Sequence, residues 1–173
     1  MGRGENYRFM KKVLFHMFFL YCLLLAELLL FGRQMDSTIP IGKYFAMYAN
    51  AMPFRTLARY ISYFLKMRDL ASFRLAFLNI GGNFVLFLPM GCLLPVLFPA
   101  MERKTKCLFV IFCVILSAEL LQGLFRVGVP DIDDLSVNML GAYIGVRGRE
   151  GRRRRRGILS LFCHRNLPCR IHW

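Results

Sequence analysis

The sequence predicts an all-α integral membrane protein, a helical bundle of four spans in which the fourth span is short. Three observations lead to this fold class. Hydrophobic residues make up 57% of the 173 residues, whereas soluble domains contain roughly 45–50% apolar residues. Long apolar runs recur along the chain, and several reach the roughly 20 residues that a helix needs to cross a bilayer. Charged residues gather between these runs and at their ends.

The net charge of +14 does not indicate a nucleic-acid partner, because the basic residues do not share one soluble face with stacking aromatics. Such a charge attracts any polyanion, including anionic lipid headgroups. The six cysteines predict no disulfide framework, since four of them lie within apolar runs, where a thiol behaves as a small hydrophobic group. The remaining Cys and His cluster matches no common zinc spacing: it consists of Cys163, His164, Cys169 and His172.

The first span covers about residues 13–32 and follows a basic leader, residues 1–12. A cleaved signal peptide would have a shorter apolar core of roughly 7–15 residues and a small-residue cleavage site. Here Ala26 is followed by Glu27 and a run of leucines. We therefore expect a retained membrane anchor, in which Glu27 pairs with Arg33 or, as the alternative, joins the polar site at the outer leaflet.

Three further spans are expected at about residues 79–99, 107–125 and 134–146. Pro89 should kink the first of these, and its freed backbone groups can be satisfied by neighbouring helices and water. The last covers only about 20 Å at the helical rise, less than the hydrocarbon thickness of about 30 Å. A shifted reading frame near Val146 would explain the abrupt change to arginine-rich sequence. We expect the basic tail, residues 147–173, to be disordered.

The positive-inside rule gives the expected orientation. Lys and Arg number four in the leader, three in residues 100–106 and nine after Val146. With alternating crossings these segments share one side, so we expect a multi-pass protein of the cell membrane with a cytoplasmic N terminus. Residues 54–68 repeat apolar positions at helical spacing, with basic residues between them. They predict an amphipathic helix in the outer interface, with a short re-entrant segment as the alternative.

Polar residues converge where this topology places the outer leaflet. A polar stripe with i, i+3, i+7 spacing marks the end of the third span, and an acidic cluster opens the fourth. Ionisable groups at membrane depth usually face a cavity and mark function. The sequence therefore predicts an outward-facing functional pocket formed by Asn83, Glu119, Gln122, Arg126, Asp131, Asp133, Asp134 and Asn138.

A structural use of the same residues is the alternative. Asp131 or Asp133 would cap the fourth span, because an acidic residue is favoured at a helix start. Glu119 and Arg126 would form an ion pair that locks one helix.

Four motifs follow one another in a set order: NAMPF at residues 50–54, NIGGNFVLFLPMG at 79–91, SAELLQ at 117–122 and DIDDLSVNMLGAYIG at 131–145. Together they resemble the VanZ-like family. The resemblance implies a four-helix envelope protein of Gram-positive-type bacteria, and the founding member of the family confers resistance to teicoplanin. The motifs also contain positions with an expected structural role, and the glycines among them permit close helix packing. These positions are Asn50, Pro53, Phe54, Asn79, Pro89, Gly91, Gly141 and Gly145.

For such a protein we expect a binding function without catalysis. The pocket would bind a lipid-linked or other envelope ligand at the outer leaflet and so modulate glycopeptide or lipoglycopeptide susceptibility. The expected partners are membrane lipids, lipid-linked cell-wall intermediates and glycopeptide antibiotics. Arg126 would contact a phosphate or carboxylate, which its guanidinium can bind in bidentate geometry. The binding function needs no cofactor.

Two alternatives stay open. One is a membrane enzyme, a metal-assisted transferase or hydrolase that acts on a lipid carrier. It would place a divalent cation at Asp131 and Asp133 and use Glu119 as general base. The other is a small channel or transporter, which would have to oligomerise because three or four short helices enclose little aqueous path.

Overall fold

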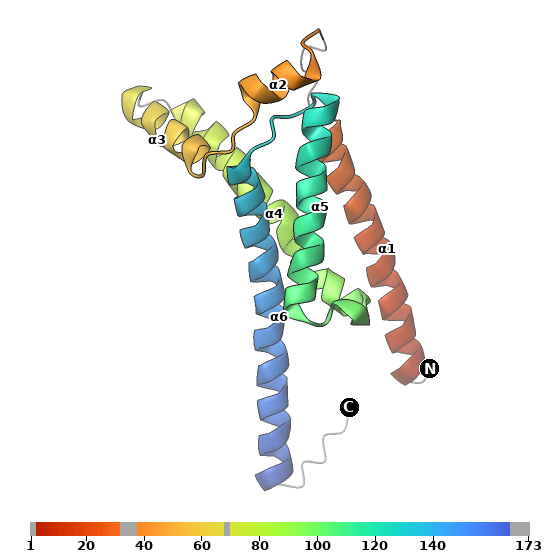
Figure 1. The fold of residues 1–173 in the computed structure, drawn as a ribbon. Helices are drawn as coiled ribbons and strands as arrows, with labels where there is room; N and C mark the ends of the chain where they lie inside the picture. Colours follow the sequence, from red (N-terminus) through yellow and green to blue (C-terminus); the bar gives the residue numbers. More distant parts are fainter. Residues whose placement is uncertain (1–2, 32–37, 68–69, 167–173) are drawn as a thin grey trace.

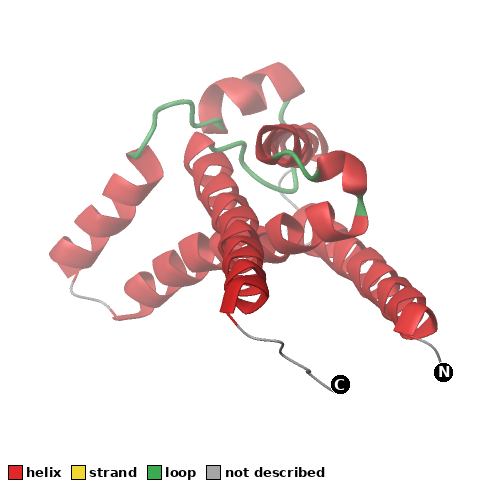
Figure 2. Cartoon of the chain, turned by 90° about the horizontal axis from the view of Figure 1, so that it is seen from below, coloured by secondary structure: helices red, strands yellow, loops and turns green. Residues whose placement is uncertain are grey.

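The chain folds as an assembly of helices joined by short turns. A computed structural model describes residues 3–31, 38–67 and 70–166. Within these ranges every regular element is helical (Figure 2), which confirms the all-α class. The elements are α1 (Arg3–Leu30), α2 (Ile41–Tyr48), α3 (Arg55–Met67), α4 (Leu70–Leu97), the 3-10 turn η1 (Pro99–Met101), α5 (Lys104–Phe125) and α6 (Ile132–Asn166).

Three helices are long and apolar enough to cross a membrane. They are Arg8–Leu30 in α1, Phe77–Leu97 in α4 and Lys104–Phe125 in α5, and they correspond to the first three expected spans. The fourth long helix, α6, does not join this set among the described residues, because its apolar part ends at Val146 and arginines follow.

The long helices alternate in direction (Figure 1). The start of α1, the turn between α4 and α5, and the C-terminal half of α6 lie toward one end of the molecule, and α2 and α3 lie at the other. This arrangement brings the end of α5 and the start of α6 to the α2–α3 end. The end of the third expected span and the start of the fourth therefore lie at the same end of the molecule.

The closest helix contact joins α4 and α6 through three glycines. A Cβ atom added at Gly141 would lie 2.1 Å from the backbone oxygen of Phe84, and one at Gly91 would lie 2.1 Å from that of Ala142. At Gly145 the added atom would lie 2.4 Å from a backbone oxygen of α4. Only residues without a side chain allow two backbones to approach so closely.

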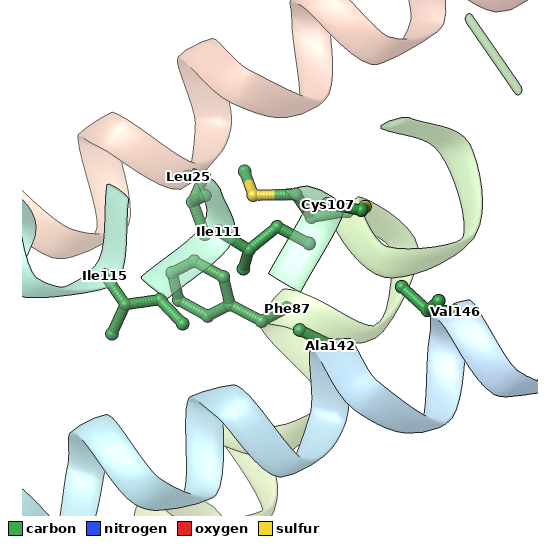
Figure 3. Close-up of a cluster of buried hydrophobic side chains, with 8 residues drawn as sticks. Leu25, Phe87, Cys107, Ile111, Ile115, Ala142 and Val146 are labelled. Atoms are coloured by element: carbon green, nitrogen blue, oxygen red, sulfur yellow. The ribbon is translucent and has the colours of Figure 1, made fainter. Parts of the chain in front are cut away.

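All four long helices contribute to one buried apolar cluster (Figure 3). Ile111 and Ile115 of α5 lie one turn apart and are fully buried, as are Phe87 of α4 and Ala142 of α6. α1 supplies only Leu25 to the cluster. Many large apolar side chains on the outer faces remain exposed, as expected for helices whose surroundings are lipid.

Three features of the fold differ from the sequence predictions. The loop between the first two spans contains an additional helix, α2, and α4 begins at Leu70, well before its expected start. α6 continues to Asn166, although we expected disorder from residue 147. Arginine is a good helix former, and the segment from Ile132 to Asn166 contains no proline, so nothing in its backbone stops the helix. The expected tail beyond Asn166 and the partner predicted for Glu27, Arg33, lie outside the described residues.

Candidate functional site

A polar cavity of about 410 Å³ lies at the α2–α3 end of the bundle. Its wall combines side chains from α3, α4 and α5 with the start of α6, and leucines of α1 close one side. The cavity is lined by five of the predicted pocket residues: Asn83, Glu119, Gln122, Asp131 and Asp134. Asn79, predicted as a motif residue, also lines it.

Glu119 and Gln122 hold the α5 side of the cavity. Glu119 is buried, with 8% of its surface exposed, and its Oε2 accepts a hydrogen bond from the backbone N–H of Asp131 at 3.3 Å. One turn later, the Nε2 of Gln122 donates to the backbone oxygen of Leu29 at 2.8 Å. The cavity wall therefore ties α5 both to the start of α6 and to the end of α1.

The segment before α3 runs beside the start of α6 as a short parallel bridge between Asn50 and Asp131. The Asn50 N–H donates to the oxygen of Pro130 at 2.9 Å, and the N–H of Ile132 donates to the Asn50 oxygen at 3.1 Å. Asn50 is itself buried, with 8% exposed. This bridge joins two motifs that are far apart in the sequence.

The side chain of Asp131 is held by three protein donors. Its Oδ1 accepts from the Asn50 side chain at 2.9 Å and from the backbone N–H of Asp133 at 2.9 Å. Its Oδ2 accepts from the hydroxyl of Thr56 at 2.5 Å. The bond from the Asp133 N–H makes Asp131 the N-cap of α6, which is the structural role that the sequence offered as the alternative.

Asp133 caps a different helix from the one expected. Its Oδ1 accepts from the N–H of Phe54 at 2.6 Å, and its Oδ2 accepts from the N–H of Thr56 at 2.8 Å. The N–H groups of Phe54 and Thr56 lie at the start of α3, where backbone donors have no partner within the helix. Phe54 stands in the left-handed region, with φ of 63°, so the carboxylate of α6 stabilises a backbone turn that costs energy in a residue with a side chain.

Three predicted pocket residues do not line the cavity: Arg126, Asp133 and Asn138. Arg126 ends α5 in a left-handed conformation with φ of 56°, and its N–H donates to the oxygens of Gln122 and Gly123. Asn138 is buried, with 2% exposed, and no described group donates to its Oδ1.

Sequence analysis missed the contribution of α3 to the cavity. Thr56, Arg59 and Tyr60 line it from this helix, and the side chain of Asn79 donates to the Tyr60 hydroxyl at 3.4 Å. The available signal is the polar face of the amphipathic pattern in residues 54–68. That pattern predicts a contact with lipid headgroups, whereas part of the face lines the cavity.

α2 covers the loop between α5 and α6. Tyr44 is 1% exposed, and its hydroxyl donates to the backbone oxygen of Gly128 at 2.9 Å. Burial raises the pKa of the Tyr44 hydroxyl. A Cβ atom at Gly123 would lie 2.6 Å from the Phe45 ring, so α2 and α5 are in close contact.

The carboxylates of Asp131 and Asp133 are engaged by the protein itself. All four of their oxygens accept hydrogen bonds from Asn50, Phe54, Thr56 or the Asp133 backbone. A divalent cation bound there would have to displace these donors. Across the ranges that the structure describes, no three His, Cys, Asp or Glu side chains gather in a way that could hold a metal ion.

Apolar helices that enclose a polar cavity at one end of a bundle define a helical membrane protein. The family model described as VanZ/LLP1 matches residues 18–147, and the chain belongs to this family. Protein VanZ of Enterococcus faecium is 34% identical over 65 residues, which are 38% of this chain and 40% of that protein. The match thus spans less than half the length of that relative. No solved structure matches the chain.

Proposed function

We propose that this VanZ-family protein lowers glycopeptide susceptibility by binding a lipid-linked or other envelope ligand in the polar cavity. In this proposal the protein lies in the plasma membrane with its N terminus in the cytoplasm. α6 forms the fourth crossing, and the cavity opens toward the outer leaflet. The teicoplanin phenotype is carried over from the family resemblance.

The observation that carries the proposal is the convergence of charged and amide side chains on one cavity at a helix-bundle end. Glu119, Asp131 and Asp134 bring carboxylates, and Arg59 brings a guanidinium. Placing ionisable groups at membrane depth is costly, and they are retained where they serve a ligand or a pathway. The mixed charges suit a polar ligand that carries both an anionic and a cationic or hydroxyl group.

The charge distribution supports the proposed orientation. The connection between α4 and α5 and the second half of α6 lie at the end opposite the cavity and are rich in Lys and Arg. Basic segments favour the cytoplasmic side. The cavity would then open on the outer side, where glycopeptides reach the envelope.

A metal-assisted enzyme would require Asp131 and Asp133 to hold a cation, whereas both side chains accept hydrogen bonds from the protein itself. Among the described residues, no observation favours the channel alternative either.

The direct test is the teicoplanin susceptibility of a Gram-positive host that expresses the chain or its Glu119→Gln variant. Glutamine keeps an oxygen for the Asp131 N–H but removes the charge, so the fold should persist. We expect protection to fall by about tenfold, which corresponds to about 1.4 kcal/mol of lost ligand affinity. Protein amounts in the membrane fraction are matched by immunoblot.

Glu27→Gln is the matched control. Glu27 is exposed and lies near the end of α1 that borders the cavity, but it does not line the cavity itself. Removal of its charge should therefore leave protection unchanged. Equal protection from the Glu119→Gln variant and the parent chain would refute the role of the cavity. Absence of protection from the stably inserted parent chain would refute the proposed phenotype.

A further inference from the structure

A second, apolar groove of about 600 Å³ lies along α1, α4 and α5. Its wall consists almost entirely of hydrocarbon and thiol side chains. The one hydroxyl, that of Ser117, donates to the backbone oxygen of Cys113 at 2.7 Å. The groove therefore offers little to a polar ligand and suits a hydrocarbon chain.

The length of the groove matches one leaflet. On α1 it extends from Phe18 to Leu30, about 18 Å at the helical rise of 1.5 Å per residue. Half of the roughly 30 Å hydrocarbon core, the depth of one leaflet, is about 15 Å. A single acyl chain lying along the helices would fill this distance.

The groove and the polar cavity share one lining residue, Leu29, near the end of α1. The backbone oxygen of Leu29 accepts the hydrogen bond from Gln122. α1 and α5 run side by side along the groove (Figure 1). A molecule that passes over Leu29 would place its polar group among the carboxylates while its chain follows α1 toward the bilayer centre.

The charges of the cavity favour one class of headgroup. Glu119, Asp131 and Asp134 line it together with Arg59. The Asp131 oxygens accept from the protein's own donors, so the proposed acceptor for a ligand is the Glu119 carboxylate, whose Oε2 accepts the Asp131 N–H. A primary ammonium can donate three hydrogen bonds to such acceptors, and a phosphate matches a guanidinium. A headgroup with phosphate and primary ammonium satisfies both signs of charge, whereas a quaternary ammonium offers no donor.

We propose that the ligand is a phospholipid with a primary ammonium headgroup, bound with its headgroup in the cavity and one acyl chain in the groove. This inference rests on the proposed function, because it names the ligand class of the same cavity. It adds a second site, the groove, whose residues the sequence did not single out.

The test uses the full chain in phosphatidylcholine vesicles that contain a small fraction of photoactivatable phosphatidylethanolamine, with a diazirine in its acyl chain. After irradiation, mass spectrometry locates the cross-links. We expect them on the groove-facing residues of α1 and α5. Probes with the same chains but a choline or glycerol headgroup should give about tenfold less product, the ratio for about 1.4 kcal/mol of headgroup selectivity.

Ala118→Phe fills the groove from α5 and should reduce the cross-link about tenfold. Leu120→Phe is the control, because Leu120 lies on the same turn, is 53% exposed and lines neither space. Glu119→Gln should leave the chain cross-links in place but reduce the preference for the ammonium headgroup. Circular dichroism melting of each variant verifies that it is folded.

Equal cross-linking by the probes with all three headgroups would mean that the protein contacts bulk lipid without selectivity, and this would overturn the proposal. Undiminished cross-linking in Ala118→Phe would overturn it as well. Selective lipid cross-linking without antibiotic protection would refute the proposed phenotype alone. Protection without selective cross-linking would refute the phospholipid alone.

Discussion

The α4–α6 contact and the α1–α5 contact are built in opposite ways. Gly91, Gly141 and Gly145 let the backbones of α4 and α6 touch, whereas an apolar groove runs along the side-by-side helices α1 and α5. The glycine contact leaves no room for a ligand, and the loose contact leaves room for a chain. The difference suggests a rigid pair of helices that holds the cavity and a more open face that admits its occupant.

The largest effect is expected where the comparison is sharpest, at the glycine contact. Gly141→Ala places a methyl group 2.1 Å from the Phe84 oxygen, so α4 and α6 must separate. We expect a loss of about 3 kcal/mol in the free energy of unfolding, toward the upper end of overpacking costs. Gly148→Ala on the same helix meets nothing within 4 Å and should be neutral or stabilising. Thermal melting in detergent measures both, and equal shifts would contradict the close contact.

The loss of the hydrogen bonds that Asp133 accepts from the start of α3 should have the second-largest effect. Asp133→Ala leaves the N–H groups of Phe54 and Thr56 without their acceptor, at a cost of about 2 kcal/mol. We expect faster hydrogen exchange in the first turn of α3, measured by mass spectrometry. Asp133→Asn keeps one acceptor oxygen and should show about half of the effect. Unchanged exchange in Asp133→Ala would show that α3 is held by other contacts.

The smallest effect is expected in the groove. Ala118→Phe enlarges a half-buried side chain that borders open space, so the unfolding free energy should change by no more than about 0.5 kcal/mol. Ala142→Phe makes the same chemical change at a fully buried position of α6 and should cost about 3 kcal/mol or more. The melting temperatures of the two variants in detergent measure this difference in stability. Similar losses would mean that α1 and α5 pack as closely as α4 and α6.

The sequence predicted the long helices because each carries a strong local signal. An apolar run of bilayer length identifies α1, α4 and α5 whatever their neighbours are. α2 was not predicted, since a helix of 8 residues is too short for periodicity to separate it from a loop. The continuation of α6 through the arginines was also missed, because like charges in a row indicate disorder from composition alone.

The polar cavity was predicted in part, for a related reason. Helix periodicity places Glu119 and Gln122 on one face, and topology brings that face to the start of α6. Periodicity does not say what an amphipathic helix packs against, so Arg59 and Tyr60 of α3 were assigned to the membrane surface. The role of Asp133 as a cap for α3 depends on a contact between distant segments, and no local pattern contains that information.

The bridge between Asn50 and Asp131 also bears on the order of events during synthesis. Its partners are 81 residues apart, and the carboxylate that holds the first turn of α3 comes 77 residues after Thr56. Since a chain emerges from its N terminus, α2 and α3 must wait at the membrane until α4, α5 and the start of α6 have been made. The polar end of the bundle therefore closes only after residues 131–133 have been made, and a chain stopped before residue 131 would leave it open.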